Sequence, residues 1–425
     1  MKETFASPPS DWKTKTAWFL ISQALSLFGS ALVQFAIIWH ITLTSMSGAM
    51  VTIATLCAFL PQVLISLLAG VWADRYNRKY LILGADSAIA LSTLILAVLF
   101  LSGYESFWLL FLILGLRSLG AGIQTPAVGA LLPQIVPSEQ LLRINGLNGT
   151  FQSLIMLIAP AASGALYSIW PLGKIFFVDV ITAVIAVIIM AMLKVPPHKN
   201  AGQIHQAGYL EDLFLGLNYV KNHTLVRHLL VFNALFMFLL VPAAFLTPLF
   251  VARVFGEEVW RLTANEIAFS GGAMLGGIII TLWGNFKNRV HVIAFTSIFF
   301  GITMALLGIS LNFIMYLSIM FISGIGLPFF NAPFISLIQE RVSEEMQGRV
   351  FSLVQIISTT TMPIGMIIFG PLSDFVSIRI LLLITGILIA LLGVRIFYNR
   401  SFVTAGSDNS IEKTMPSAEA PAKLQ

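Results

Sequence analysis

Three ionisable side chains lie inside long apolar segments of the sequence: Asp86, Arg117 and Asp179. Charged groups in such segments are costly, so each is a candidate functional residue. We expect Arg117, near the middle of its segment, to face a central cavity or to pair with an acid. Asp86 is a candidate proton carrier, and the alternative is that it caps or pairs near one end of its segment. For Asp179 we expect a packing role.

A fourth acid, Glu266, stands at the start of another apolar segment. An acid in the first turn of a helix is stabilised by the helix dipole, so this placement is ordinary and a coupling role is the alternative. Four neutral polar residues in the apolar segments are further candidates for a cavity lining: Gln23, Gln34, His40 and Asn233. The sequence has no Gly-rich phosphate loop, metal-ligand pair or nucleophile elbow. We therefore expect no enzyme, no metal and no cofactor.

The densest group of charges is the stretch GVWADRYNRKY, Gly70 to Tyr80, between two apolar segments. It holds one acid and three basic residues in a chain of which only 10% is charged: Asp74, Arg75, Arg78 and Lys79. Basic residues in such a link also follow from the tendency of cytoplasmic links to be positive, so Arg78 and Lys79 have two possible roles. An acid gains nothing from that tendency. We therefore expect Asp74 to have a specific partner.

The composition indicates an integral membrane protein. The chain has 425 residues, of which 57% are hydrophobic and only 10% are charged. A soluble protein carries about 25% charged residues. Runs of about 20 apolar residues can cross the hydrocarbon layer as helices. Twelve such spans are predicted, at 17–42, 47–72, 80–101, 107–127, 147–169, 174–194, 227–251, 263–284, 290–311, 313–334, 350–372 and 377–397. The net charge of +5 is spread over short links, which argues against nucleic acid as a partner.

The placement of lysine and arginine predicts the orientation. With the N-terminus inside, four of the 24 basic residues fall on the outer side: Lys174, Arg253, Arg261 and Arg379. Arg117 lies within a span, and the others are on the inner side. Because inner links carry the excess of basic residues, we expect both termini and the GVWADRYNRKY link in the cytoplasm.

The sequence divides into two similar parts. We expect four segments: a six-helix half at 1–195, a central cytoplasmic loop at 196–223 that ends in a surface helix, a second six-helix half at 224–400 and a disordered tail at 401–425. The two halves have similar sequence patterns at an offset near 204 residues, so that Pro126 corresponds to Pro328 and Pro160 corresponds to Pro363. Two parallel six-helix halves with a site between them near the bilayer midplane describe a secondary transporter.

The chain resembles the major facilitator superfamily. The stretch GVWADRYNRKY is similar to that superfamily's signature between spans 2 and 3, roughly G-x-x-x-D-R-x-G-R-[RK]. The matching residues are Gly70, Asp74, Arg75, Arg78 and Lys79. Asn77 stands in place of the usual glycine, and both residue types tolerate a left-handed backbone.

Two further stretches resemble drug antiporters of the superfamily. RSLGAG is similar to their pattern of an arginine followed by glycines, with Arg117 at the arginine. APAASG stands where they tend to have G-P-x-x-G-G: Pro160 and Gly164 match, and we expect these two to form a hinge in helix 5, whereas Ala159 and Ser163 differ. Most of the chain resembles bacterial macrolide-efflux proteins, through LILGADSAIA, RSLGAGIQTPAVGALLPQIVPSEQL, ANEIAFSGGAMLGG and GRVFSL…MPIGMI.

The superfamily resemblance implies a gate at the inner surface. It implies that Asp74 lies at the N-terminus of the eleventh helix, near Gly348 and Arg349, where unsatisfied N–H groups favour an anion. This contact would favour the outward-facing state. Gly70 would let the second helix end against close neighbours. The basic residues of the signature would hold the link at the surface and pair with Asp74 or Glu139: Arg75, Arg78 and Lys79.

We therefore expect an all-α membrane protein of the major facilitator fold, in the bacterial inner (plasma) membrane, that exports amphiphilic drugs, macrolide-like antibiotics first. Without an ATP-binding motif, an ion gradient should drive export, in exchange for protons. The expected partners are a small amphiphilic substrate, protons and the lipid bilayer, and the expected state is a monomer. One alternative is an exporter of a siderophore or metabolite on the same fold. Another is a non-transporting membrane sensor or scaffold, which would normally add a folded soluble domain that no link here can hold.

Overall fold

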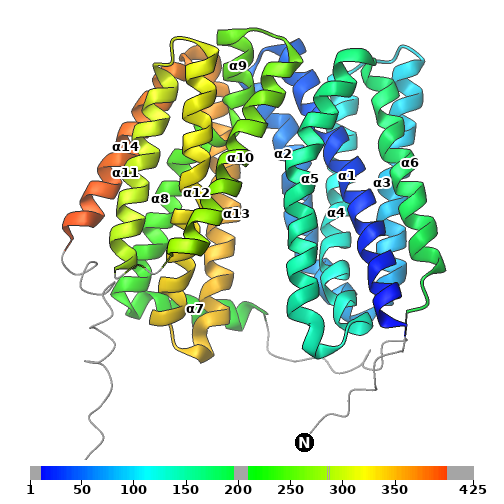
Figure 1. The fold of residues 1–425 in the computed structure, drawn as a ribbon, viewed down its shortest axis with the longest axis horizontal. Helices are drawn as coiled ribbons and strands as arrows, with labels where there is room; N and C mark the ends of the chain where they lie inside the picture. The colour runs from blue at the N-terminus through cyan, green and yellow to red at the C-terminus, as the bar shows by residue number, and fades with distance from the viewer. Residues whose placement is uncertain (1–10, 196–208, 285, 287, 400–425) are drawn as a thin grey trace, which may run out of the picture. The chain divides into compact units, whose positions relative to one another are not determined.

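The computed structural model describes residues 11–195, 209–284, 286 and 288–399 (Figure 1). The predicted disordered tail at 401–425 and the first part of the predicted central loop, 196–208, lie outside the described residues. All elements in the described part of the chain are helices, and twelve of them are long and apolar enough to cross a membrane. The prediction of an all-α chain with twelve spans is confirmed.

The helices follow the predicted spans, with small shifts at their ends. Their bounds are α1 Trp12–Ser45, α2 Gly48–Arg75, α3 Arg78–Leu101, α4 Phe107–Ile135, the short 3-10 helix η1 Ser138–Gln140, α5 Leu141–Ile169, α6 Leu172–Met192, α7 Tyr209–Asn222, α8 Thr224–Phe245, α9 Thr247–Phe255, α10 Val259–Trp283, α11 Arg289–Gly308, α12 Phe313–Arg341, α13 Glu344–Phe375 and α14 Ile378–Tyr398. The second part of the predicted central loop forms α7, as expected.

The seventh predicted span differs from the prediction of one continuous helix. In the structure α8 ends at Phe245 and α9 begins at Thr247, with Pro248 near its start. Proline has no N–H to donate to the carbonyl four residues earlier, so the ladder of helical hydrogen bonds stops here. Apolar composition continues through this break, which is why hydropathy alone does not reveal it.

The GVWADRYNRKY stretch is almost entirely helical, which corrects its description as a link. Asp74 and Arg75 lie in the last turn of α2, and α3 begins three residues later at Arg78. Asn77, at φ −66° and ψ 111°, precedes α3, and its side chain accepts a hydrogen bond from the Lys79 N–H at 3.0 Å. The backbone here is not left-handed. Asparagine serves instead as an N-cap, a position that favours its side-chain oxygen.

The described residues form two compact units. Unit 1 holds the described residues up to 195 together with Phe245–Ile267 and Met366–Val376; unit 2 holds the rest. Unit 1 therefore contains α1 to α6, and also α9, the start of α10 and the end of α13. The predicted six-helix halves are segments of sequence, and their boundaries stay a prediction.

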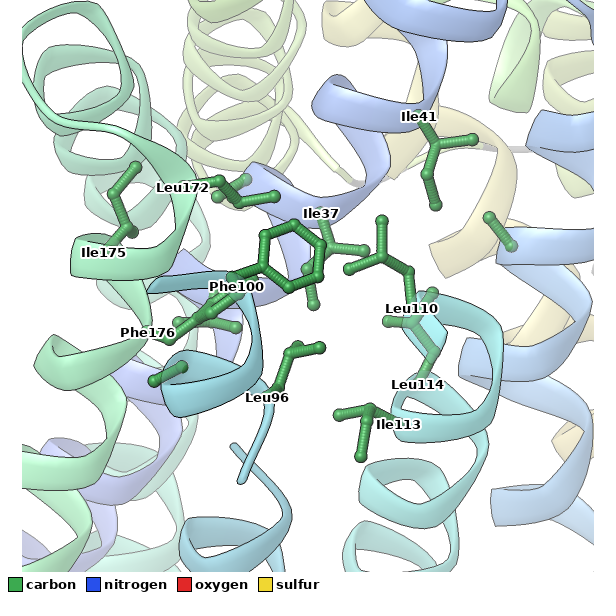
Figure 2. Packing of buried hydrophobic residues seen from close by; sticks show 14 of the residues in the cluster. Ile37, Ile41, Leu96, Phe100, Leu110, Ile113, Leu114, Leu172, Ile175 and Phe176 are labelled. Carbon is green, nitrogen blue, oxygen red and sulfur yellow. The ribbon is translucent and has the colours of Figure 1, made fainter. Parts of the chain in front are cut away.

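The core of unit 1 is a cluster of aliphatic and aromatic side chains from α1, α2, α3, α4 and α6 (Figure 2). Phe100 of α3 packs edge-on against Phe176 of α6, with ring centroids 5.5 Å apart. The buried members labelled in Figure 2 are Ile37, Ile41, Leu96, Phe100, Leu110, Ile113, Leu114, Leu172, Ile175 and Phe176. This packing fixes the mutual positions of the helices that carry the predicted ionisable residues.

Unit 2 relies on close helix contacts at glycines and on stacked aromatic rings. A Cβ atom at Gly272 of α10 would clash with the Phe321 carbonyl of α12, so only glycine allows these helices to approach so closely. Phe236 of α8 stacks on Phe330 of α12 with centroids 4.1 Å apart. In Figure 1, α7 lies across the ends of the long helices, and its Gly216 lies against Arg349 of α13.

Candidate functional site

The structure pairs two of the three predicted ionisable residues. Arg117 of α4 forms an ion pair with Asp179 of α6 through Nη1 and Oδ2. Arg117 is 6% exposed and Asp179 is not exposed at all. The prediction that Arg117 faces a cavity or pairs with an acid is met by the second option. Asp179 is the acid that compensates a buried cation.

Two more helices complete the hydrogen bonds of this pair. Thr93 of α3 donates to Asp179 Oδ2 at 2.8 Å, and Ser30 of α1 donates to Asp179 Oδ1 at 3.2 Å. Arg117 Nη2 also donates to the Ser30 carbonyl oxygen at 3.1 Å. A Cβ atom at Gly29 would clash with Thr182 of α6, so this glycine allows α1 to approach α6 at the same level. Four helices of unit 1 therefore meet at one charge-neutral group.

Asp86 of α3 lies in a second polar group, in which its hydrogen-bond partners are neutral side chains. Its Oδ1 accepts hydrogen bonds from Ser26 Oγ at 2.9 Å and from Gln124 Nε2 at 2.6 Å. Asp86 is 1% exposed, and its Oδ2 has no hydrogen-bond partner in the described part of the chain. Across the same residues, no lysine, arginine or histidine forms an ion pair with Asp86.

The two groups lie at successive levels of the same three helices. On α3, Thr93 follows Asp86 by seven residues, two turns or about 10 Å along the axis. On α1, Ser30 follows Ser26 by one turn. Helix α4 runs in the opposite direction, so that Gln124 joins the Asp86 group and Arg117 joins the Asp179 group. We call this arrangement the polar column of unit 1.

Glu266 does not occupy the position that the sequence indicated. Helix α10 begins at Val259 rather than near residue 263, so Glu266 lies about two turns inside the helix. The prediction that it opens the helix, and with it the helix-dipole explanation, is therefore wrong. Glu266 is partly buried and accepts a hydrogen bond from Asn265 Nδ2 at 3.2 Å. Its coupling role stays a prediction.

The predicted hinge residues lie in the middle of a continuous helix. Helix α5 runs unbroken through Pro160, and both Pro160 and Gly164 are buried. A Cβ atom at Gly164 would clash with Thr263 of α10, in the part of α10 that belongs to unit 1. Gly164 therefore has a packing role as a point of close helix approach, and its role as a hinge stays a prediction.

The basic residues of the GVWADRYNRKY stretch join helix ends within unit 1. Arg78 donates to the Ala73 carbonyl at 2.8 Å and to the Ala130 carbonyl of α4 at 2.9 Å. Lys79 donates to carbonyls at the end of α6, those of Ala191 at 2.7 Å and Leu193 at 2.8 Å. A cation is favourable at a helix C-terminus, where carbonyls lack helical partners. These two residues therefore have a structural role in addition to their charge.

Asp74 lies 3.6 Å from Arg78 Nη2, as one of the predicted pairings requires. Both Asp74 and Arg75 are exposed at the end of α2. Around Gly70, a Cβ atom would meet no heavy atom within 4 Å in the described part of the chain, so the structure lacks the close neighbours expected there. The contact of Asp74 with the start of the eleventh span, and with it the gating role of Gly70, stays a prediction.

The sequence reasoning missed the neutral members of the polar column. Ser26, Ser30, Thr93 and Gln124 supply most of its hydrogen bonds and were not predicted. Gln23, which was predicted as a polar lining residue, accepts a long hydrogen bond from Gln124 at 3.4 Å. Thr93 lies seven residues after Asp86 on α3, Gln124 lies seven residues after Arg117 on α4, and Ser30 lies four residues after Ser26 on α1, so each pair shares one face of its helix. That periodicity is the signal by which they could have been found.

Comparison with known proteins agrees with this architecture. The family model of the Major Facilitator Superfamily matches residues 19–366. Macrolide efflux protein A of Streptococcus pyogenes is 31% identical over 387 residues, which cover 91% of this chain and 96% of that protein. The Staphyloferrin A transporter of Staphylococcus aureus is 25% identical over 370 residues, covering 84% of this chain and 89% of that protein.

A solved structure supports the fold. The crystal structure of the nucleoside transporter NupG superimposes with a TM-score of 0.67 at 14% sequence identity, over 91% of this chain and 99% of that chain. Twelve apolar helices, the match of the family model over most of the chain and this structural likeness lead to one conclusion. The chain is a multi-pass membrane protein that belongs to the Major Facilitator Superfamily.

Proposed function

We propose that the protein exports amphiphilic drugs, macrolide-like antibiotics first, across the bacterial inner membrane in exchange for protons. In this proposal it works as a monomer with both termini in the cytoplasm. The observation that carries the proton exchange is the environment of Asp86. It is a fully buried carboxyl group held by two neutral donors, and no described cation pairs with it.

A buried carboxylate without a cation is costly in a low-dielectric interior. Asp179 avoids this cost by pairing with Arg117, whereas Asp86 can avoid it by binding a proton. Asp86 Oδ2 is the atom that would carry this proton, because Oδ1 already accepts two hydrogen bonds. Opening of the column to water would allow the proton to leave, and reclosure would require one to return.

Arg117 supports this assignment from the next level of the column. Its charge is already compensated by Asp179, so it does not stabilise an ionised Asp86 through a direct ion pair. The pair also fixes the positions of α1, α3, α4 and α6 around Asp86. We assign Asp86 as the proton site and the Arg117–Asp179 pair as the group that holds the surrounding helices in place.

The substrate class rests on the relatives. Macrolide efflux protein A of Streptococcus pyogenes is similar over 91% of this chain, and its name states both the substrate class and the direction of transport. The resemblance covers 91% of this chain and 96% of that protein, so it extends over most of the membrane-spanning part of the sequence. Macrolides are therefore the first compounds to test.

Proteoliposomes that contain the purified protein test the proposal directly. An imposed pH gradient should drive accumulation of a labelled macrolide, and an uncoupler should abolish it. Asp86→Asn keeps the size and hydrogen-bonding capacity of the side chain but removes its titration. It should retain exchange of labelled for unlabelled macrolide without a gradient and should lose gradient-driven accumulation.

Glu105→Gln is the matched control, because it removes an acid that lies exposed between α3 and α4. It should leave both activities unchanged. Gradient-driven accumulation at the parental rate in Asp86→Asn would contradict the proton assignment. Accumulation that persists with ATP and no gradient would contradict the antiport mechanism, and absence of any macrolide exchange would contradict the substrate class.

The second candidate function is export of a siderophore or metabolite on the same fold. The relative named Staphyloferrin A transporter, 25% identical over 84% of this chain, favours keeping it. The same proteoliposomes separate the two candidates. Exchange of a carboxylate-rich small molecule, with none for macrolides, would favour the second.

A further inference from the structure

The start of α2 is capped by an acid that is distant in the sequence. Asp374, in the last turn of α13, accepts hydrogen bonds from the backbone N–H groups of Gly48 at 2.7 Å and Ala49 at 3.0 Å. Ser47 Oγ donates to the same carboxylate at 2.8 Å. The first N–H groups of a helix lack helical partners and carry partial positive charge, so an anion is favourable here. All these residues belong to unit 1.

Arg253, in the last turn of α9, closes the network around this carboxylate. Its Nη2 pairs with Asp374 Oδ1 at 2.7 Å, and its Nη1 donates to the Ser373 carbonyl at 2.6 Å. The same guanidinium donates to the Met46 carbonyl, at the end of α1. One arginine therefore satisfies carbonyls at two helix C-termini while it compensates the acid that caps α2.

Small residues let the two helices approach closely beside this network. A Cβ atom at Gly370 of α13 would clash with Thr52 of α2, and one at Gly48 would clash with Ser373 and with the Gly370 carbonyl. Thr52 is 4% exposed, and its Oγ1 donates to the Gly48 carbonyl at 2.7 Å and to the Met366 carbonyl at 3.3 Å. The first turns of α2 are therefore in direct contact with the last turns of α13.

The sequence around Asp374 repeats the spacing of the superfamily signature. Gly370 precedes Asp374 by four residues, as Gly70 precedes Asp74, and each pair lies at the C-terminal end of its helix. Asp374 at the end of α13 caps the start of α2. The expected inner gate is the reciprocal contact, in which Asp74 at the end of α2 caps the start of α13.

We propose that Asp374, Arg253 and the first turn of α2 form an outer latch that holds the outer side of the transporter closed and must release in each transport cycle. This inference rests on the proposed function for the orientation and for alternating access. In an alternating-access transporter, the outer ends of the helices must separate before substrate can leave. Separation of α2 from α13 would break the hydrogen bonds and the ion pair of Asp374.

Thiol labelling tests the latch without any assumption about substrate or coupling ion. With Cys57, the single cysteine of the chain, replaced by serine, Thr52→Cys places a probe under the Gly370 contact. A membrane-impermeant reagent added outside the cells should label this probe slowly in the parent. In Asp374→Asn or Arg253→Gln, labelling should be about tenfold faster. This rise corresponds to a shift of about 1.4 kcal/mol in the two-state equilibrium between the closed and the open latch. Glu105→Gln, an exposed acid elsewhere in unit 1, should not change the rate.

A reversible cross-link decides the question if these variants do not reach the membrane. Ser47 Oγ lies 2.8 Å from Asp374 Oδ2, so the double variant Ser47→Cys/Asp374→Cys brings two thiols together. Oxidation should stop macrolide exchange, and reduction should restore it. Equal labelling of Thr52→Cys with and without Asp374→Asn would overturn the latch, as would failure of the two thiols to cross-link or undiminished exchange when they are cross-linked. Faster labelling together with absence of macrolide transport would support the latch and refute only the proposed substrate.

Discussion

The Arg117–Asp179 pair allows a quantitative test of the site. Both side chains are buried, and each is the other's ionic partner. Removing one partner of such a buried pair costs about 3–5 kcal/mol, because the other charge is left uncompensated. Asp179→Asn should be the more harmful single change, because a guanidinium cannot be deprotonated whereas a carboxylate can bind a proton.

The double variant should be less harmful than the sum of its parts. Arg117→Met combined with Asp179→Asn removes both charges and keeps much of the volume, a replacement that is often close to neutral. Suppose that each single variant lowers the free energy of unfolding by about 3 kcal/mol and that the double variant lowers it by no more than a single variant does. The effect of the double variant is then about 3 kcal/mol smaller than the sum of the two single effects.

Unfolding of the purified protein in denaturant, followed by the fluorescence of its eight tryptophans, measures these losses. Arg143→Met, which removes an exposed arginine, is the control and should leave the unfolding midpoint unchanged. Transport adds a second reading. Arg117→Met should abolish export, whereas Arg117→Lys should retain part of it because the charge survives without the planar fork. Losses that add within about 0.5 kcal/mol would refute an energetic coupling of the pair.

Two further predictions concern the inner gate and helix α5. Asp74→Asn should slow transport and shift the inward–outward ratio by up to about tenfold, so that a probe cysteine at Gly348 reacts faster from the cytoplasm. Equal labelling with equal transport would make Asp74 a surface acid only. Gly164→Ala should lower the free energy of unfolding by about 1–3 kcal/mol, because its Cβ meets Thr263. Gly146→Ala in the same helix, where a Cβ meets nothing within 4 Å, should not; equal effects of the two substitutions would remove the packing role of Gly164.

The sequence was sufficient for the spans and for the ionisable residues of the column. Long apolar segments can only be membrane helices in a chain of this composition, and a charge within them is rare enough to stand out. Asp86, Arg117 and Asp179 were recognised on that ground. The partners of Arg117 could not be derived in the same way, because Asp179 is 62 residues away and the pairing depends on which faces of α4 and α6 meet.

Other features lacked a distinctive signal in the sequence. Serine, threonine and glutamine are tolerated in membrane helices, so Ser26 and Gln124 did not stand out from many similar residues. Asp374 lies at the end of a span, where an acid is unremarkable, and only its spacing from Gly370 links it to the signature. The break before α9 lies beside Pro248, but a proline alone does not predict a break, because Pro160 is accommodated within the continuous helix α5.

The order of synthesis means that Arg117 is made before Asp179, the acid with which it pairs. Span 4 leaves the ribosome before span 6, and 62 residues separate the two side chains. At about 5–20 residues per second, Asp179 is synthesised about 3–12 s after Arg117. Insertion of an arginine at the centre of a helix costs about 2.5–3.5 kcal/mol. Ser30 and Thr93, which also bind this guanidinium, are made earlier and are already present when it arrives. The hydroxyl and carbonyl groups of spans 1 and 3 can therefore hold the nascent fourth helix in the bilayer until the sixth is inserted.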